Sequence, residues 1–232
     1  MNAAQYPRFI AQKIAVARGD RLLLTDINFS LQASQLLRIV GENGSGKTSL
    51  LRIIAGLSEA ESGTLRWLDS EQTSHHHHEK NTSHYISNYT DNIAYIGHRD
   101  GLKNTLSAIE NLRFYQQLHQ DATSAERGVV NDTNESERLL HQLKLLDHAD
   151  VLAGSLSFGQ RRRLAFARLL LASQPLWLLD EPFTGIDIEG RTLIESICEQ
   201  HLQAGGMIIM THHGSLDGSL LGPYESQLNL MG

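Results

Sequence analysis

The sequence predicts an α/β fold with a mainly parallel central sheet, and three observations support this prediction. Short apolar runs of strand length alternate with segments whose apolar residues recur at helical spacing. Such alternation is typical of a parallel sheet, because each helix carries the chain back across the sheet. A glycine-rich segment separates one apolar run from the next helical segment, and polar residues follow two further runs. Ligands of these folds bind beyond the carboxyl ends of the strands, where these segments fall.

The N-terminal part of the chain contains three predicted strands and one helix. The strands are expected at residues 10–16, 27–31 and 36–40, with a turn at 18–20 between the first two. The third run, Leu-Leu-Arg-Ile-Val, is short and apolar, which indicates a buried strand. Residues 49–55 then have helical spacing, and Gly56 is expected as the C-cap of that helix.

The C-terminal part of the chain is expected to alternate helices with buried strands. An amphipathic helix is predicted from Leu139, Leu140, Leu143, Leu145 and Leu146. A second helix is expected at 161–171, and buried strands are expected at 176–179 and 207–210. Polar residues follow both strands, so both are expected to end at the binding edge of the sheet.

Two polar segments are interpreted as loops. Residues 69–92 are rich in Ser, Thr, Asn and His and lack periodicity, so we expect an extended surface loop. Residues 121–136 are interpreted as a loop between helices. The run His75-His76-His77-His78 invites a metal or haem interpretation, but contiguous histidines do not share one face of a helix or strand. A loop tract is therefore favoured over a preformed site.

Composition bounds the function. The 232 residues suffice for one domain, 1–232, with room for a subdomain, and 41% are hydrophobic. The net charge of −6 does not favour non-specific binding to nucleic acid. The single cysteine, Cys198, excludes an internal disulfide and fits a reducing compartment. No signal peptide and no apolar run of about 18 residues is found, so any work at a membrane is expected to proceed through partners.

The glycine-rich segment fits the phosphate-binding pattern G-x-x-x-x-G-K-[ST] at all eight positions, in a strand–loop–helix context. Its residues are Gly41, Glu42, Asn43, Gly44, Ser45, Gly46, Lys47 and Thr48. Glycines let the backbone turn tightly and direct N–H groups at phosphate oxygens, and the following helix adds its positive N-terminal end. Lys47 is expected to reach the β- and γ-phosphates, and the Thr48 hydroxyl to ligate Mg²⁺.

Two carboxylates end the predicted strand at 176–179. Asp180 is expected to hold Mg²⁺, directly or through water, and Glu181 is the candidate general base or positioner of the attacking water. Side chains of neighbouring residues in a strand leave in different directions, which suits two different roles. The alternative is a pair of solvated acids opening a turn before Pro182, and proximity to a phosphate loop disfavours it.

With these motifs, the chain resembles the ATP-binding cassette family from about residue 10 to about residue 216. The motif that carries the resemblance is Leu156-Ser157-Phe158-Gly159-Gln160, set between the phosphate loop and the Asp180-Glu181 pair. The resemblance implies a P-loop NTPase cassette with an N-terminal antiparallel β part and a helical subdomain at about 98–155. It also implies that two cassettes pair head to tail, with ATP between the phosphate loop of one and the signature, residues 156–160, of the other.

The resemblance assigns further site residues. The predicted nucleotide-binding positions beyond the phosphate loop are Ser157, Gly159, Gln160, His98 and Asp187. A Ser hydroxyl, a glycine N–H and a helix N-terminus would together form an anion site for the partner's γ-phosphate. Asp187 matches the aspartate of the D-loop, the family's dimer-interface loop. His212 matches the histidine that senses the γ-phosphate and is predicted to be catalytic with Glu181 and Lys47; a capping role for His212 stays open, since His213 is adjacent.

A narrower resemblance points to the haem-exporter ATPases of cytochrome c maturation. It rests on residues 95–103, 106–115, 160–169 and 176–183. The Tyr-x-Gly-His run ending at His98 is peculiar to that group, whereas most cassettes carry a glutamine there. The resemblance implies haem export or cytochrome c biogenesis, a homodimer, integral membrane partner subunits, and a peripheral location on the cytoplasmic face of the inner membrane. The alternative is a drifted glutamine loop in another small transporter.

Three residues depart from the family pattern. His98 offers fewer hydrogen bonds than an amide. Arg18 stands where an aromatic usually stacks on adenine, and it could stack through its guanidinium plane or be a surface charge. Phe158 stands where a small residue is usual.

A non-transport cassette protein of translation or DNA repair is the second hypothesis. Such relatives usually carry two cassettes or a long coiled coil, and this chain has neither.

Overall fold

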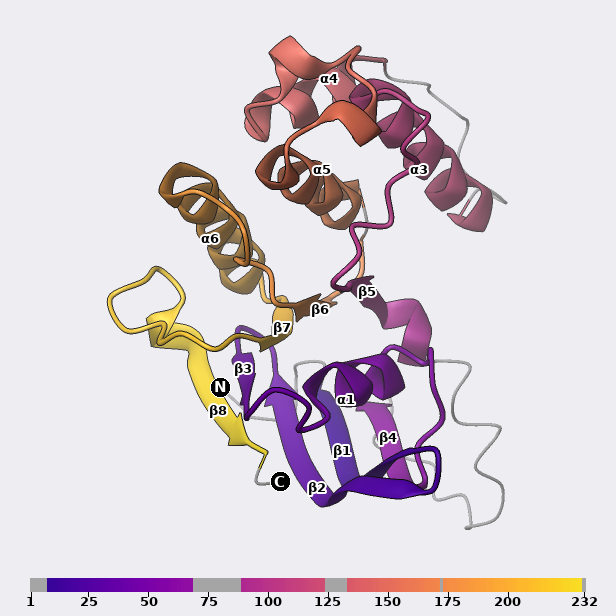
Figure 1. Cartoon of the computed structure of the whole chain (residues 1–232), viewed down its shortest axis with the longest axis vertical. Coiled ribbons are helices and arrows are strands. Elements are labelled where there is room, and N and C mark those ends of the chain that lie inside the picture. Colours follow the sequence, from indigo (N-terminus) through magenta and orange to yellow (C-terminus); the bar gives the residue numbers. More distant parts are fainter. Residues whose placement is uncertain (1–7, 69–88, 124–132, 172, 231–232) are drawn as a thin grey trace. The chain divides into compact units, whose positions relative to one another are not determined.

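The computed structural model describes residues 8–68, 89–123, 133–171 and 173–230 (Figure 1). The chain divides into two compact units. The first unit takes in Met1–Tyr95, Gln174–Pro182 and Ile197–Gly232, and the second takes in Ile96–Ser173 and Phe183–Ser196. The predicted His75–His78 loop lies outside the described residues.

A three-stranded antiparallel sheet forms one layer of the first unit. Its strands are β1 (Arg8–Arg18), β2 (Arg21–Gln32) and β4 (Ser62–Leu68), in the order β2-β1-β4. The predicted strands at 10–16 and 27–31 are therefore both present, and both are longer than expected. Gly19 takes a left-handed conformation, φ 59°, in the turn between β1 and β2. These contacts confirm the antiparallel β part that the sequence predicted.

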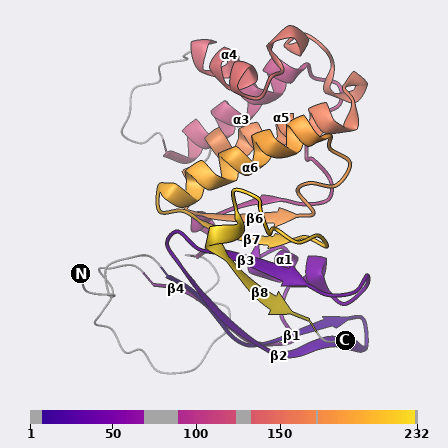
Figure 2. The same ribbon diagram turned by 90° about the vertical axis from the view of Figure 1, so that its left-hand side faces the viewer.

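The central sheet has five strands in the order β5-β6-β7-β3-β8 (Figures 1 and 2). The strands are β3 (Leu36–Val40), β5 (Ile93–Ile96), β6 (Leu176–Asp180), β7 (Met207–Thr211) and β8 (Glu225–Asn229). Pairs β6–β7, β7–β3 and β3–β8 are all parallel, as predicted. Every residue of β6 and β7 is buried, which explains why both runs are continuously apolar.

Helix α1 (Lys47–Ile54) follows β3 and packs its apolar side chains into the core of the first unit. Leu50, Leu51 and Ile54 are fully buried. The helix ends at the cap Ala55, and Gly56 follows in a left-handed conformation, φ 70°. The glycine thus stands one position after the C-cap, where a residue without a Cβ is favoured.

The second unit contains helices α3 (Ala108–Thr123), α4 (Thr133–Gln142) and α5 (Phe158–Leu171), which pack on one another (Figure 2). The subdomain predicted at about 98–155 lies within the range of this unit. Helices α3 and α5 begin with the same device, in which a serine and a residue three positions later bond each other's backbone. Helix α6 (Ile188–Gln203) begins in the second unit and ends in the first.

Three sequence-based boundaries were wrong. The helix predicted from the leucines at 139–146 ends at Gln142, because Lys144 is left-handed at φ 56°, and Leu143 and Leu145 are buried in the turn that follows. The loop predicted at 121–136 is helical at both ends. Ser136 is fully buried and donates to Gln116 Oε1 of α3 at 2.8 Å, so tertiary packing outweighs the polar composition. At the end of the loop predicted at 69–92, the described residue Tyr89 is buried and a 3₁₀ turn follows it.

Candidate nucleotide-binding site

The phosphate loop joins the end of β3 to the start of α1. Gly44 and Gly46 are left-handed, with φ 87° and 98°, and Gly46 caps the N-terminus of α1. At Gly41 a Cβ would lie 2.6 Å from Ser45 Oγ, closer than a side chain tolerates. The left-handed backbone favours glycine at Gly44 and Gly46, Gly41 is closely packed, and the predicted tight turn of the loop is present.

Lys47 lies over this loop rather than in solvent. Its side chain is only 8% exposed, and Nζ donates to the carbonyl oxygens of Gly41 at 2.7 Å and of Glu42 at 2.9 Å. The ammonium charge is thus held at the loop itself. An anion bound by the loop would meet a charge already in place, which reduces the reorganisation that binding requires.

Asp180 is the centre of a buried polar cluster at the ends of β6 and β7. It is 1% exposed and accepts the Thr48 hydroxyl, with Oγ1 3.2 Å from Oδ1 and 3.0 Å from Oδ2. The Thr211 hydroxyl donates to Asp180 Oδ1 at 2.7 Å. The two residues predicted to hold a metal ion, Thr48 and Asp180, are therefore in direct contact although 132 positions separate them.

Glu181 is held by the last residue of β7 and by the segment that follows it. Its backbone is left-handed, φ 50°, and its N–H donates to Thr211 Oγ1 at 2.9 Å. His213 Nε2 lies 3.1 Å from Glu181 Oε1. His212, the predicted phosphate sensor, is half-buried beside them. Sequence reasoning did not assign a role to Thr211 or His213, although both stand in the polar segment that ends a buried strand.

Arg38 also escaped the sequence reasoning. It is 5% exposed in β3, its Nε lies 2.5 Å from Glu225 Oε1, and its NH1 donates to Gly214 O at 2.7 Å. Arg38 thereby fixes the backbone just after His212 and His213. An arginine in the middle of an otherwise apolar strand was the sequence signal that could have identified it. A buried charge needs partners, so such an arginine indicates a structural ion pair or hydrogen bonds.

The remaining predicted site residues belong to the second unit. Ser157 and Gln160 cap α5: the Ser157 N–H donates to Gln160 Oε1 at 2.9 Å, and the Gln160 N–H donates to Ser157 Oγ at 3.2 Å. Gln160 Nε2 lies 2.9 Å from His148 Nε2. Ser157 is exposed and Gly159 is half-buried at the N-terminus of the helix. Of the pair that caps the helix, Gln160 is held inside the unit, whereas Ser157 faces solvent.

Phe158 packs on the segment that contains Asp187. A Cβ on Gly185 would lie 2.7 Å from the Phe158 ring, and Gly185 is left-handed at φ 71°. Asp187 Oδ1 accepts the Gly190 N–H at 2.8 Å and so caps the start of α6. The large side chain at the unusual signature position is accommodated because residue 185 has no side chain.

His98 is exposed in the turn that follows β5. The site residues therefore fall into two groups. Lys47, Thr48, Asp180, Glu181 and His212 lie in the first unit, and the structure describes that group by itself. His98, the signature residues and Asp187 lie in the second unit.

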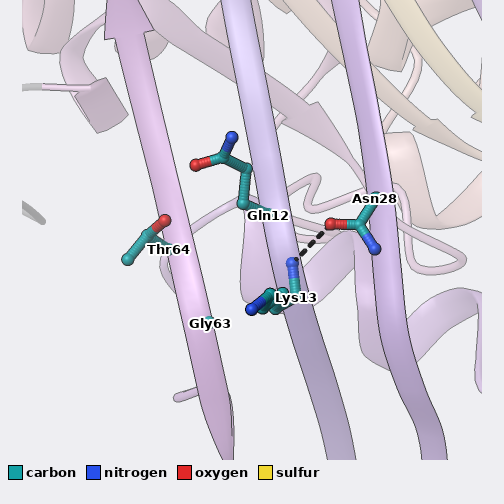
Figure 3. Close-up of a pocket in the computed structure, with 5 residues that line it drawn as sticks. All are labelled: Gln12, Lys13, Asn28, Gly63 and Thr64. Carbon is teal, nitrogen blue, oxygen red and sulfur yellow. Dashed lines mark hydrogen bonds between the residues drawn. The ribbon is translucent and has the colours of Figure 1, made fainter.

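A separate pocket of about 330 Å³ lies on the antiparallel sheet, lined by Gln12, Lys13, Asn28, Gly63 and Thr64 (Figure 3). Lys13 is left-handed at φ 52°, in an irregular stretch of β1, and its N–H donates to Asn28 Oδ1 at 2.8 Å. None of these residues is a predicted site residue. Within the described residues, no group of three or more His, Cys, Asp or Glu side chains is arranged to hold a metal ion. None of the helices described combines the length and the hydropathy that crossing a membrane requires.

The phosphate loop, the Asp180 cluster and the parallel sheet together define a P-loop nucleotide-binding protein. The chain belongs to the ABC transporter family, whose model matches residues 24–184. It is 41% identical over 207 residues to the cytochrome c biogenesis ATP-binding export protein CcmA of Methylococcus capsulatus, covering 89% of this chain and 91% of that protein. The CcmA of Mannheimia succiniciproducens is also 41% identical, over 209 residues, with 90% and 89% covered.

The solved structures agree on the fold. A putative ABC transporter ATP-binding protein from Pyrococcus furiosus superposes with a TM-score of 0.72 at 21% identity, covering 96% of this chain and 97% of that one. The family and fold that the sequence predicted are therefore confirmed.

Proposed function

We propose that this chain is the ATP-hydrolysing subunit of an ABC transporter complex that serves haem export or cytochrome c biogenesis. The observation that carries the proposal is the contact of Thr48 with Asp180, which joins the phosphate loop to the carboxylate pair. The similarity to CcmA proteins over about nine-tenths of the chain supports the biological assignment.

The phosphate loop would bind the nucleotide. Lys47, already held at the loop, would neutralise charge on the β- and γ-phosphates. Binding would exchange its bonds to the Gly41 and Glu42 carbonyls for bonds to phosphate oxygens. The ammonium group is charged in both cases, but a phosphate oxygen carries negative charge that a carbonyl oxygen lacks, so the exchange favours the bound state.

Thr48 and Asp180 fit a Mg²⁺ ion. Both present hard oxygen donors, which that ion prefers, and they lie 3.0 Å apart at the end of β6. When bound, the ion would supply positive charge that offsets the developing charge on the phosphates. Thr211 would keep the Asp180 carboxylate oriented toward it.

Glu181 would position or deprotonate the attacking water. Its backbone is fixed by Thr211, and its carboxylate is next to the His212–His213 segment. His212 would contact the γ-phosphate, as the family pattern predicts. Arg38 would keep that segment in place through Gly214 O.

A second copy of the chain would complete the site. The exposed Ser157 hydroxyl and the N-terminal end of α5 would meet the γ-phosphate held by the partner, in a head-to-tail homodimer. Asp187 would lie at the dimer interface, and His98 would lie at the contact with integral membrane subunits. The dimer would then be a peripheral component on the cytoplasmic face of the inner membrane. A non-transport role in translation or repair has no observation in its favour.

Glu181→Gln tests this proposal directly. The variant should bind ATP like the wild type but hydrolyse it at a small fraction of the rate, and it should form a dimer that light scattering detects only with ATP. A Glu181→Gln chain that binds ATP and stays monomeric would contradict the proposed sandwich dimer.

A further inference from the structure

Three arginines of α5 converge on one short loop of the second unit, residues 97–101. Arg162 NH1 donates to Gly97 O at 2.8 Å, and Arg168 NH1 donates to Asp100 O at 3.0 Å. Arg161 Nε lies 3.4 Å from Asp100 Oδ2. We call these three arginines and the loop they hold the arginine clamp. The loop contains the exposed His98, and α5 begins at the signature.

The charges at the centre of the clamp are buried. The side chains of Arg162 and Asp100 are 2% and 6% exposed, with Arg162 NH1 3.5 Å from Asp100 Oδ1. Removing two charges from water is costly, and such a pair is weak support for stability alone. A buried, hydrogen-bonded pair does, however, admit few alternative geometries, because each would leave a charge without a partner.

The same loop is fixed on its other side by α3. The Tyr115 hydroxyl donates to Gly101 O, and Arg168 stacks 4.6 Å from the centre of the Tyr115 ring. Asn111 is fully buried and bonds both backbone groups of Lys103, at 2.9 and 3.1 Å. Backbone and side chains therefore hold residues 97–103 between α3 and α5, while His98, Arg99 and Lys103 stay exposed.

Arg161 links the clamp to the signature. The Arg161 side chain contacts Asp100, and the Arg161 backbone N–H donates to Ser157 O at 2.9 Å, which closes the first turn of α5. Displacing the loop by breaking the clamp would therefore act directly on the turn that presents Ser157 and Gly159.

We propose that Asp100 and Arg162 are positioning residues, which make the exposed loop at 97–101 and the N-terminal turn of α5 move as one body. This rests on the proposed function, in which Ser157 and Gly159 meet a nucleotide held by the partner. Movement imposed on the loop by a docked subunit is then transmitted to the signature without changing the phosphate loop. Asp100 and Arg162 contact no substrate in this scheme and act through the turn they hold.

Asp100→Asn tests the inference, because it removes the charge and keeps the shape. In the full chain, at a temperature where the variant is folded, kcat should fall about 10- to 10²-fold, whereas ATP affinity at the Lys47 site should stay within about twofold. Asp100→Glu should recover part of kcat. Lys144→Gln breaks an exposed ion pair with Glu189 in the same unit and should leave both quantities unchanged.

Hydrogen exchange of the nucleotide-free chain provides a readout that does not depend on catalysis. Asp100→Asn should speed exchange at residues 97–101 and also at 158–162, about tenfold in both segments. Faster exchange at the loop alone would overturn the inference, and so would a wild-type kcat in Asp100→Asn. If Asp100→Asn does not fold, Arg161→Gln serves instead, because it removes the partly exposed partner of Asp100. It should speed exchange in both segments, 97–101 and 158–162. A wild-type chain without ATPase activity would count against the proposed function, and the exchange result would still decide the clamp.

Discussion

In the first unit, the two side chains proposed to hold the metal ion bond directly to each other, whereas in the second unit the proposed contact residue Ser157 is exposed at the start of a helix. The exposed Thr48 donates its hydroxyl to the buried Asp180, which also accepts the hydroxyl of the buried Thr211. Ser157, by contrast, presents its exposed side chain on a turn that Gln160 caps, at the start of the helix that carries the buried Arg162. The first group, which we call the first half-site, is thus assembled by bonds among its own side chains, whereas the second group, the second half-site, presents an exposed side chain to the partner of the proposed dimer.

The largest effect is expected from the first half-site, at Lys47. Lys47→Ala removes the charge held at the loop, and hydrolysis should fall about 10²- to 10³-fold because that charge stabilises the transition state. A steady-state phosphate-release assay measures the rate. Lys13→Ala, a lysine of the pocket on the antiparallel sheet, is the matched control and should hydrolyse ATP at the wild-type rate. Equal losses in both variants would show that the loop charge is not special.

Thr211 supports the same half-site from outside the motif. Thr211→Val removes the hydroxyl that orients Asp180 and accepts the Glu181 N–H, so kcat should fall about 10- to 10²-fold. Thr211→Ser keeps the hydroxyl and should retain most of the activity. If Val and Ser variants behave alike in a kcat measurement, the hydroxyl does not hold the carboxylates as described.

The second half-site can be tested at the contact of Phe158 with Gly185. Gly185→Ala places a methyl group against the ring and strains a left-handed residue, which should lower the free energy of unfolding by about 2–4 kcal/mol. Adding Phe158→Ala to the Gly185→Ala variant should recover the part of the lost stability that comes from the clash with the ring. The part that comes from backbone strain at residue 185 should remain. Chemical denaturation of the wild type, the two single variants and the double variant gives the coupling free energy between the two residues. Strictly additive effects would show that they do not pack together.

The smallest effect concerns the pH dependence of stability and involves none of the predicted site residues. Burial lowers the pKa of His201 to about 4, while its ring stacks on Trp177 with 3.7 Å between ring centroids and Nε2 lies 3.1 Å from Pro175 O. The unfolded chain binds the proton below about pH 6.5, so stability is complete above that pH and declines as the pH falls toward 4. The slope should be about 1 kcal/mol per pH unit between roughly pH 6 and 4.5. In His201→Phe, the denaturation midpoint should depend less on pH over that range. An unchanged dependence on pH would show that His201 is not the group responsible.

The sequence predicted those residues whose role depends on local spacing. The spacing of Gly41, Gly44 and Gly46 identifies the phosphate loop, in which Gly44 and Gly46 are left-handed, and Asp180 ends a strand whose apolar run is plain in the sequence. Arg38 was missed because its partner Glu225 is 187 positions away, and Thr211 because its two bonds cross between strands. The periodicity of apolar residues in the sequence carries no information about contacts between residues so far apart in the chain.

The helix boundaries failed for a related physical reason. A leucine pattern continues through Lys144, yet the backbone there turns left-handed, and the next residue, Leu145, is buried from a turn rather than from a helix. Apolar spacing reports which residues are buried, not which backbone conformation buries them. The arginine clamp escaped prediction in the same way, because Asp100 and Arg162 meet only through tertiary packing.

The central claim is that the phosphate loop and the signature of one chain serve different sites, and mixing two inactive chains tests it most directly. Lys47→Ala and Ser157→Arg should each be inactive alone. A heterodimer of the two contains one intact loop opposite one intact signature, so an equal mixture should recover about a quarter of wild-type activity if the two sites of a symmetric dimer act independently. A mixture that stays as inactive as its components would contradict the account.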